Sequence, residues 1–249
     1  MILAAGKGKR LRPLTDSVPK ALVEIEGIPL LGWVARDLLD AGVHRLIVNT
    51  HHLAAQIEAF ISNQDGLGVP TVVSREDAVS SIPLETGGAL VHAAPLFEAK
   101  APFLLHNADV ISDIQLGPIY QEHLAGEDRD GRIATLIVTE RTTTRPLLVD
   151  EDGVFGRANR VEGWQLIARH PAARGTREVG FTGIHIVSER IFNHLTEKGA
   201  FSLMDSYMRL IGEGEHIAVH DATGAAWYDI GTPERLEEAR EGLATKWSQ

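Results

Sequence analysis

An apolar stretch that runs directly into a glycine-rich, basic turn is the feature that most constrains this fold. Residues 1–5 are apolar and long enough for a buried strand, and Gly6 and Gly8 follow at alternate positions. Glycine allows the backbone to turn sharply and to bring its N–H groups close to a ligand. Cations gather in and beside the turn, and they are Lys7, Lys9, Arg10, Arg12 and Lys20. A strand that ends in such a turn suits a polyanion, most simply a nucleoside triphosphate.

Two common phosphate-binding motifs are excluded by their spacing. A dinucleotide fingerprint, G-x-G-x-x-G, needs a third glycine at position 11, which is Leu11. A P-loop needs Ser or Thr after its Gly-Lys pair, but Gly8 and Arg10 follow the two such pairs in this stretch. A surface turn with solvated cations is the alternative interpretation, and a G-x-G pair on its own favours it.

The overall charge makes this basic cluster conspicuous. The chain of 249 residues has a formal net charge of −10, which argues against a nucleic-acid binder. A local group of cations on an acidic chain draws an anionic ligand to one place. There is no cysteine, so disulfides and thiolate metal sites are excluded. No apolar run approaches the ~20 residues of a membrane span. We therefore expect a cytoplasmic protein without a nucleic-acid or membrane partner.

Strand and helix patterns alternate through the first half of the chain. Helical spacing over 29–41 precedes a β-branched run at 46–48, a second helical segment at 53–61 and an apolar strand at 70–74. This alternation predicts an α/β fold, a Rossmann-like, mostly parallel sheet flanked by helices. Ligands of such sheets bind at the carboxyl ends of the strands, which is where the turn at 6–10 would lie.

The region 140–187 has a different pattern, with short strands and an Asp-Gly turn that indicates a hairpin. We expect a single domain over 1–249 in which 140–187 is an inserted antiparallel lobe. Within it, Thr182 and Gly183 lie in a predicted strand. A glycine in a strand can serve close packing alone, without any role in ligand binding.

Residues 83–90 are typical of a helix start. Thr86 would be the cap, and Gly87 and Gly88 would let a flat base lie against exposed backbone amides. A capped helix without any ligand is the simpler alternative, and the two interpretations are compatible.

Two aspartates occupy positions that suit a metal. Asp109 follows the apolar strand predicted at 102–106, and a carboxylate at the end of a central strand suits Mg²⁺. Asp109 as the cap of the following turn is an equal alternative. Asp229 precedes Thr232 and Pro233, which are a good N-cap and a good first residue for a helix. The cap gives Asp229 no role, and spacing alone does not bring the two aspartates together.

The stretch 3–20 resembles the LxxGxGxRLxPLTxxxPK signature of the sugar-1-phosphate nucleotidylyltransferases. Further motifs follow in the family order up to about Leu243, namely NxD at 107–109, Thr-Gly at 182–183 and WxDxGTP at 227–233. Lys9 departs from the Thr or Ser of many members. Met1 leaves a first strand shorter than is usual in the family, which indicates a trimmed or misassigned N-terminus.

The resemblance implies a role for each matched residue. The glycine loop would wrap the triphosphate, Arg10 would grip its phosphates and Lys20 would contact the reacting ones. The implied nucleotide-binding residues are Leu3, Ala4, Ala5, Gly6, Lys7, Gly8, Lys9, Arg10, Lys20, Thr86, Gly87, Gly88 and Asn107. The implied catalytic residues are Arg10, Lys20 and Asp109, the implied metal ligands Asp109 and Asp229, and the implied sugar-binding residues Thr182 and Gly183.

The same resemblance implies a Mg²⁺-dependent enzyme that condenses a nucleoside triphosphate with a sugar 1-phosphate to give a nucleotide-sugar and pyrophosphate. The segment 83–88, PLETGG, is similar to that of uridylyltransferases acting on N-acetylmuramic acid 1-phosphate, which favours UTP. A GTP-dependent mannose-1-phosphate guanylyltransferase is the alternative, and a non-catalytic nucleotide-binding regulatory subunit is the alternative from another class. An EKP sugar-binding segment is missing, which leaves the sugar open. We expect a monomer or a homodimer.

Overall fold

The parallel strands of the N-terminal half form the middle of the fold in this computed structural model, which describes residues 1–97 and 101–247. The short strand β1 (Ile2–Leu3) pairs in parallel with a neighbour on each side, giving the strand order β6-β1-β4-β5. The neighbours are β4 (Leu46–Thr50), β5 (Thr71–Arg75) and β6 (Phe103–Asn107). β1 is shorter than the predicted strand at 1–5, because the chain leaves the sheet at residue 4 to enter the glycine turn.

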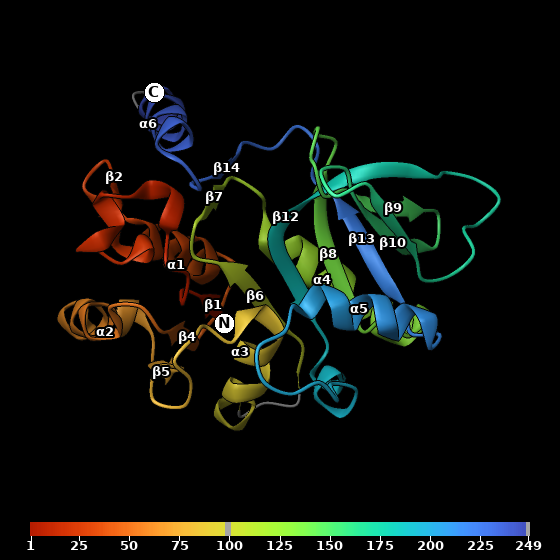
Figure 1. Cartoon of the computed structure of the whole chain (residues 1–249), viewed down its shortest axis with the longest axis horizontal. Helices are drawn as coiled ribbons and strands as arrows, with labels where there is room; N and C mark the ends of the chain where they lie inside the picture. Colours follow the sequence, from red (N-terminus) through yellow and green to blue (C-terminus); the bar gives the residue numbers. More distant parts are fainter. Residues whose placement is uncertain (98–100, 248–249) are drawn as a thin grey trace.

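Helices cover both faces of this sheet (Figure 1). Side chains alternate along a strand, so in β4 Leu46 and Val48 belong to one apolar cluster and Ile47 to the other. The first face is covered by α1 (Leu30–Asp40), α2 (Ala54–Asn63) and α4 (Leu116–Asp130). The opposite face is covered by α3 (Glu85–Ala93) and α5 (Leu203–Gly212). The predicted fold class, a Rossmann-like mixed sheet flanked by helices, is confirmed.

One long strand joins this sheet to an antiparallel region. β12 (Arg177–Val187) pairs with β6 through its last residues and with β9 through its first residues. The antiparallel region, on the right of Figure 1, comprises β9 (Leu147–Asp150), β10 (Gly153–Asn159) and β11 (Trp164–Ile167). β8 (Ala134–Thr139) also pairs with β12, and β13 (Ile217–Asp221) pairs in parallel with β8. The predicted hairpin is present, whereas the assignment of 140–187 as a lobe of a single domain stays a prediction.

The ends of three helical segments follow local sequence. α4 continues through the charged segment to Asp130 and ends at Gly131 with φ +70°, a left-handed cap that glycine adopts readily. Ser188 precedes only a short 3-10 turn at Glu189–Asn193. The start of α6 (Pro233–Trp247) is as predicted, and the Arg235 backbone N–H donates to Thr232 Oγ1. None of the described helices is long and apolar enough to cross a membrane.

Buried histidines make the fold sensitive to acid, and two of the three in the described chain, His106 and His185, lie on adjacent strands of the sheet. His106 and His185 are 0% and 3% exposed, and burial lowers the pKa of His106 to about 4 and that of His185 to about 3. Both side chains are therefore neutral in the fold, whereas the unfolded chain protonates them below a pKa of about 6.5. A depressed folded-state pKa means that their contribution to stability is complete above pH 6.5 and is lost as the pH falls below it.

We expect His185→Gln to reduce this acid sensitivity. Between pH 7.5 and pH 5 each buried histidine should lower the free energy of unfolding by about 2 kcal/mol. Urea unfolding at the two pH values should therefore show a loss that is about 2 kcal/mol smaller in the variant than in the wild type. His170→Gln, which alters an exposed histidine, is the control. Equal losses in the wild type and His185→Gln would contradict the interpretation.

Candidate active site

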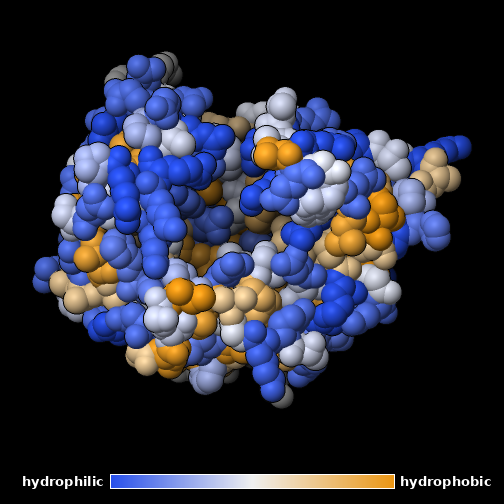
Figure 2. All heavy atoms as spheres, in the orientation of Figure 1, coloured by the Kyte–Doolittle hydropathy of each residue, from blue (hydrophilic) through white to orange (hydrophobic). Residues whose placement is uncertain are grey.

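The carboxyl ends of three parallel strands meet beside a pocket of about 230 Å³. Leu3 of β1 lies in register with Asn49 of β4 and with Asn107 of β6, and all three line the pocket. Figure 2 shows the molecule hollowed between the N-terminal half and the antiparallel strands, with hydrophilic residues along much of the rim. The predicted nucleotide-binding and catalytic residues that line the pocket are Leu3, Ala4, Ala5, Gly6, Lys20, Thr86, Asn107 and Asp109. The pocket lies at the sheet edge where the sequence predicted a ligand site.

The glycine turn is shaped by Gly8 rather than by Gly6. Gly8 has φ +59°, and a Cβ at this position would lie 2.8 Å from Thr15 Cγ2 and 3.2 Å from Lys20 Cβ. The Thr15 hydroxyl also donates to Gly8 O at 2.8 Å. Gly6 is exposed, with open space where a Cβ would be. Gly8 thus lets the turn close onto Thr15 and Lys20, which places the lysine against the pocket.

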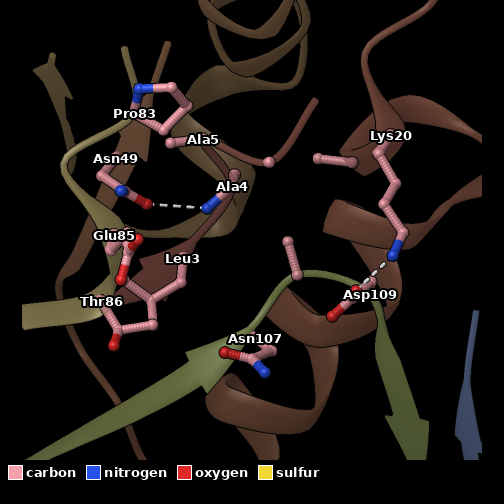
Figure 3. Close-up of a pocket in the computed structure, with 13 residues that line it drawn as sticks. Leu3, Ala4, Ala5, Lys20, Asn49, Pro83, Glu85, Thr86, Asn107 and Asp109 are labelled. Carbon is pink, nitrogen blue, oxygen red and sulfur yellow. Dashed lines mark hydrogen bonds and ion pairs between the residues drawn. The ribbon is translucent and has the colours of Figure 1, made fainter. Parts of the chain in front are cut away.

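Lys20 and Asp109 form an ion pair at the edge of the pocket (Figure 3). The two side chains are only 12% and 28% exposed, so water screens this pair less than a surface pair. Lys7, Lys9 and Arg10 are not among the lining residues, and the last two are exposed. The basic cluster of the sequence is therefore divided between one cation fixed at the pocket and several on the turn above it.

A short pair of strands places the backbone segments of the two predicted metal ligands side by side. β7 (Val110–Ser112) follows Asp109 directly, and it pairs antiparallel with β14 (Trp227–Asp229). The Ile230 backbone N–H donates to Asp109 O at 2.8 Å, so Asp109 and Asp229 lie on neighbouring strands. Within the described part of the chain no group of three or more His, Asp or Glu side chains could hold a metal. Two carboxylates nevertheless fit Mg²⁺, which completes its coordination with water and substrate phosphates.

Cations surround Asp229 as well. Asp229 forms an ion pair with Arg235, and the Arg10 guanidinium lies beside it against Gly231. A Cβ on Gly231 would lie 2.6 Å from Arg10 Nη2 and 3.1 Å from Asp229 Oδ1. Gly231, which precedes Thr232 and Pro233, thus leaves the room that the Arg10 guanidinium needs to lie close to Asp229. Lys20 and Asp109 line the pocket, whereas Arg10 and Asp229 lie on the neighbouring segment and are not among the lining residues.

Two buried polar residues of the site were missed by the sequence analysis. Asn49 Oδ1 accepts from the Ala4 backbone N–H at 2.7 Å, and Asn49 Nδ2 donates to Glu76 Oε1 at 2.5 Å. Glu76 is 0% exposed, and its Oε2 accepts from the Leu84 backbone N–H at 2.8 Å. This network fixes the start of the glycine turn relative to the segment at 83–88. Two features of the sequence could have indicated them. Asn49 interrupts a largely apolar strand, and Glu76 directly follows the next strand.

The predicted roles of Gly87 and Gly88 as an exposed amide surface are wrong. Both amides donate to Phe201 O, at 2.9 and 3.4 Å. A Cβ on Gly87 would lie 2.2 Å from the Phe201 ring, and one on Gly88 would lie 2.3 Å from Gly199 O. These glycines therefore admit the segment before α5 against α3, and they have no free N–H for a base.

Thr86 is also not the cap of its own helix. It is the second residue of α3, and its hydroxyl accepts from the Leu203 backbone N–H at 2.9 Å, at the start of α5. Glu85 begins α3 with φ +59°, an unusual backbone conformation for a residue other than glycine, and lines the pocket with Pro83 and Thr86 (Figure 3). The part of this segment that faces the pocket is therefore at 83–86.

Thr182 cannot contact a sugar through its hydroxyl. The side chain is 1% exposed, and its Oγ1 donates to Ile137 O at 2.8 Å within the sheet. Gly183 has φ +90°, and a Cβ there would lie 2.6 Å from Asn107 Nδ2. Neither residue is among those that line the pocket. Their place in the structure is explained by packing, with Gly183 giving room to the Asn107 side chain.

Comparison with known proteins assigns the chain to a family. The sequence profile described as nucleotidyl transferase matches residues 1–246, so the chain belongs to this family, that of the sugar-1-phosphate nucleotidylyltransferases. N-acetylmuramate alpha-1-phosphate uridylyltransferase of Neisseria meningitidis is 32% identical over 99% of this chain and 98% of its own length. Mannose-1-phosphate guanylyltransferase catalytic subunit beta of Drosophila pseudoobscura is 31% identical over 94% of this chain and 59% of its own.

The fold is shared with solved structures of the same class. The crystal structure of UDP-glucose pyrophosphorylase with UDP-glucose superposes with a TM-score of 0.74. The superposition covers 98% of this chain and 97% of the pyrophosphorylase chain, and the two sequences are 16% identical. The resemblance stated from the sequence motifs is confirmed.

We expect Asn49→Ala to destabilise the protein strongly. The substitution leaves the Ala4 N–H and a Glu76 oxygen without partners, and each unmet buried group costs about 1–3 kcal/mol. Urea unfolding at pH 7 should therefore show a loss of roughly 2–5 kcal/mol. Gln56→Ala is the control, because that exposed amide donates to Ser17 O at 3.0 Å. It should cost less than about 0.5 kcal/mol. Equal stability of the two variants would sink the proposed importance of the network.

Proposed function

We propose that this nucleotidyltransferase is a Mg²⁺-dependent enzyme that joins UTP to a sugar 1-phosphate, releasing pyrophosphate. The observation that supports the proposal is the Lys20–Asp109 ion pair at the pocket beside β1, next to the segment on which Arg10 approaches Asp229. A non-catalytic regulatory subunit is less consistent with this site, because both cations and both carboxylates are retained together.

The reaction is a displacement at phosphorus between two anions. A phosphate oxygen of the sugar 1-phosphate attacks the α-phosphorus in line with the departing pyrophosphate, and no residue of the protein becomes covalently attached. Repulsion between the anions is the main obstacle, so positioning and charge neutralisation matter more than a strong base. Lys20 supplies a compact positive charge at the pocket, close to the reacting phosphates. Arg10, with its planar fork of donors, suits the β- and γ-oxygens of the leaving group.

The metal would be held by Asp109 and Asp229. Both carboxylates form ion pairs with cations in this structure. Mg²⁺ and Lys20 would therefore compete for Asp109, and Lys20 would then pair with the substrate phosphates. When bound, Mg²⁺ would supply positive charge that offsets the phosphate charges. Asp109 and Asp229 would be its protein ligands, while Lys20 and Arg10 would neutralise the remaining phosphate charge.

We expect Asp109→Asn and Asp229→Asn to raise the Mg²⁺ concentration needed for half-maximal activity and to lower the maximum rate. Both substitutions remove a charge with little change in volume. The double variant should lose less than the sum of the two free-energy penalties, since either loss spoils the same ion. Magnesium titrations of pyrophosphate release measure this, with Asp65→Asn as an exposed control at the positive φ that Asn tolerates. Strictly additive penalties would contradict a shared metal.

The preference for UTP rests on the uridylyltransferase relative, which the chain matches over nearly its full length. With the amides of Gly87 and Gly88 engaged, the groups left for the base are those of Pro83, Glu85 and Thr86. The Glu85 carboxylate could accept the ring N–H of uracil, but it could equally accept the N–H groups of guanine. The guanylyltransferase relative therefore supports GTP and mannose 1-phosphate as a second candidate pair.

We expect kcat/KM for UTP to exceed that for GTP by at least ~10-fold, since a site that pairs with polar groups of one base discriminates against another. Equimolar UTP and GTP are offered in one tube to a panel of sugar 1-phosphates, and the products are resolved by mass. A dominant GDP-sugar would reverse the base assignment and leave the reaction class intact. Absence of pyrophosphate release with every pair would refute the catalytic proposal.

A further inference from the structure

An arginine of the antiparallel region lies close to Asp229 without a matching anion. Arg141 follows β8, and its half-buried side chain rests on the ring of Trp227, with Cζ 4.3 Å from the ring centroid. Its stem fits against Gly180, where a Cβ would lie 2.5 Å from Arg141 Cγ and Nε. Arg141 Nη2 donates to Phe181 O at 2.7 Å. The side chain is therefore held in a defined position by two strands, β12 and β14.

The charge of Arg141 is not balanced by the protein. In the parts of the chain that the structure describes, no carboxylate forms an ion pair with it, and its buried Nε has no hydrogen-bond partner. Burial lowers the pKa of Arg141 below the usual range, and the negative charge of Asp229 acts in the opposite direction. A partly desolvated cation costs free energy unless an anion compensates for it. A position that retains such a cation in a fixed geometry is suited to receive an anion from a ligand.

The surroundings of Arg141 connect it to the candidate active site. Three consecutive residues of β12 each contact a different group: Phe181 O accepts from Arg141, Thr182 O accepts from Trp227 Nε1 at 2.9 Å, and Gly183 packs on Asn107. Trp227 and Asp229 project to the same side of β14, because side chains two apart in a strand share a face. Arg141 thus lies near Asp229, on the side where the chain passes into the antiparallel strands.

We propose that Arg141 binds an anionic group of the acceptor sugar phosphate and thereby selects the acceptor. This inference rests on the proposed function. A guanidinium binds a carboxylate or a phosphate with two parallel hydrogen bonds. Because Arg141 is already stacked on Trp227, its side chain loses less conformational entropy when an anion binds. The anion has two possible sources. One is the 1-phosphate common to all acceptors, and the other is a carboxylate on the sugar, which N-acetylmuramic acid carries and N-acetylglucosamine lacks.

The test compares Arg141→Gln with the wild type on N-acetylmuramic acid 1-phosphate and N-acetylglucosamine 1-phosphate, read by pyrophosphate release. We expect the acceptor KM to rise about 10- to 100-fold for the first acceptor, the scale for losing a charged hydrogen bond, with the KM for UTP unchanged. An unaltered KM for the second acceptor assigns the contact to the carboxylate, and an equal rise for both assigns it to the phosphate. Unchanged acceptor KM values for both, or a rise confined to UTP, would overturn the inference.

Two further arms keep the result interpretable. Arg145→Gln removes an exposed arginine four residues further on and should leave both acceptor KM values unchanged. Arg141→Lys, which keeps the charge without the planar fork, should show a smaller rise than Arg141→Gln and serves if that variant does not fold. If no substrate pair releases pyrophosphate, the proposed function fails. Calorimetric binding of the two acceptors to the wild type and Arg141→Gln then decides on Arg141, and equal or absent binding refutes its role.

Discussion

The parallel register of one short strand is the constraint on which the candidate site depends. β1 has two residues, and it is held on both sides, so that Leu3 lies opposite Asn49 and Asn107. The glycine turn begins at the next residue, whose N–H is bound by Asn49. A slip of one residue in this pairing would exchange the side chains of β1 between the two apolar clusters and separate the turn from both asparagines. The backbone hydrogen bonds of β1 therefore align the strand ends that border the pocket.

The charges of the site are arranged as opposed pairs. Lys20 faces Asp109, Arg235 faces Asp229, and Arg10 lies beside the second pair. In this arrangement most of the cations needed for a polyphosphate are already neutralised by carboxylates, so the half-buried site does not hold a large uncompensated charge. Substrate phosphates and a metal would exchange partners with these pairs rather than meet empty cations and anions. Arg141 differs from the others because it has no such carboxylate.

Much of the site was predictable because its residues follow strands. The position of Gly6, Gly8 and Asp109 at strand ends follows from alternating patterns and from the geometry of parallel sheets. The proximity of Asp109 and Asp229 did not follow, since it depends on the pairing of β7 with β14 across the chain. The same holds for Gly87 and Gly88: their use against Phe201 is a contact between distant segments, which local pattern does not contain. Asn49 and Glu76 were missed because a buried polar pair has no periodic signature.

The two ends of β12 differ in how strongly the rest of the fold constrains them. Its last residues are paired with β6 and are tied to the chemistry through the strands that end at the pocket. Its first residues carry the hairpins β9–β11, which take no part in the alignment of β1. Insertions or substitutions in those hairpins would leave the register of the parallel strands intact. The two ends of one continuous strand are thus under different constraints, since only its last residues pair with the strand that borders the pocket.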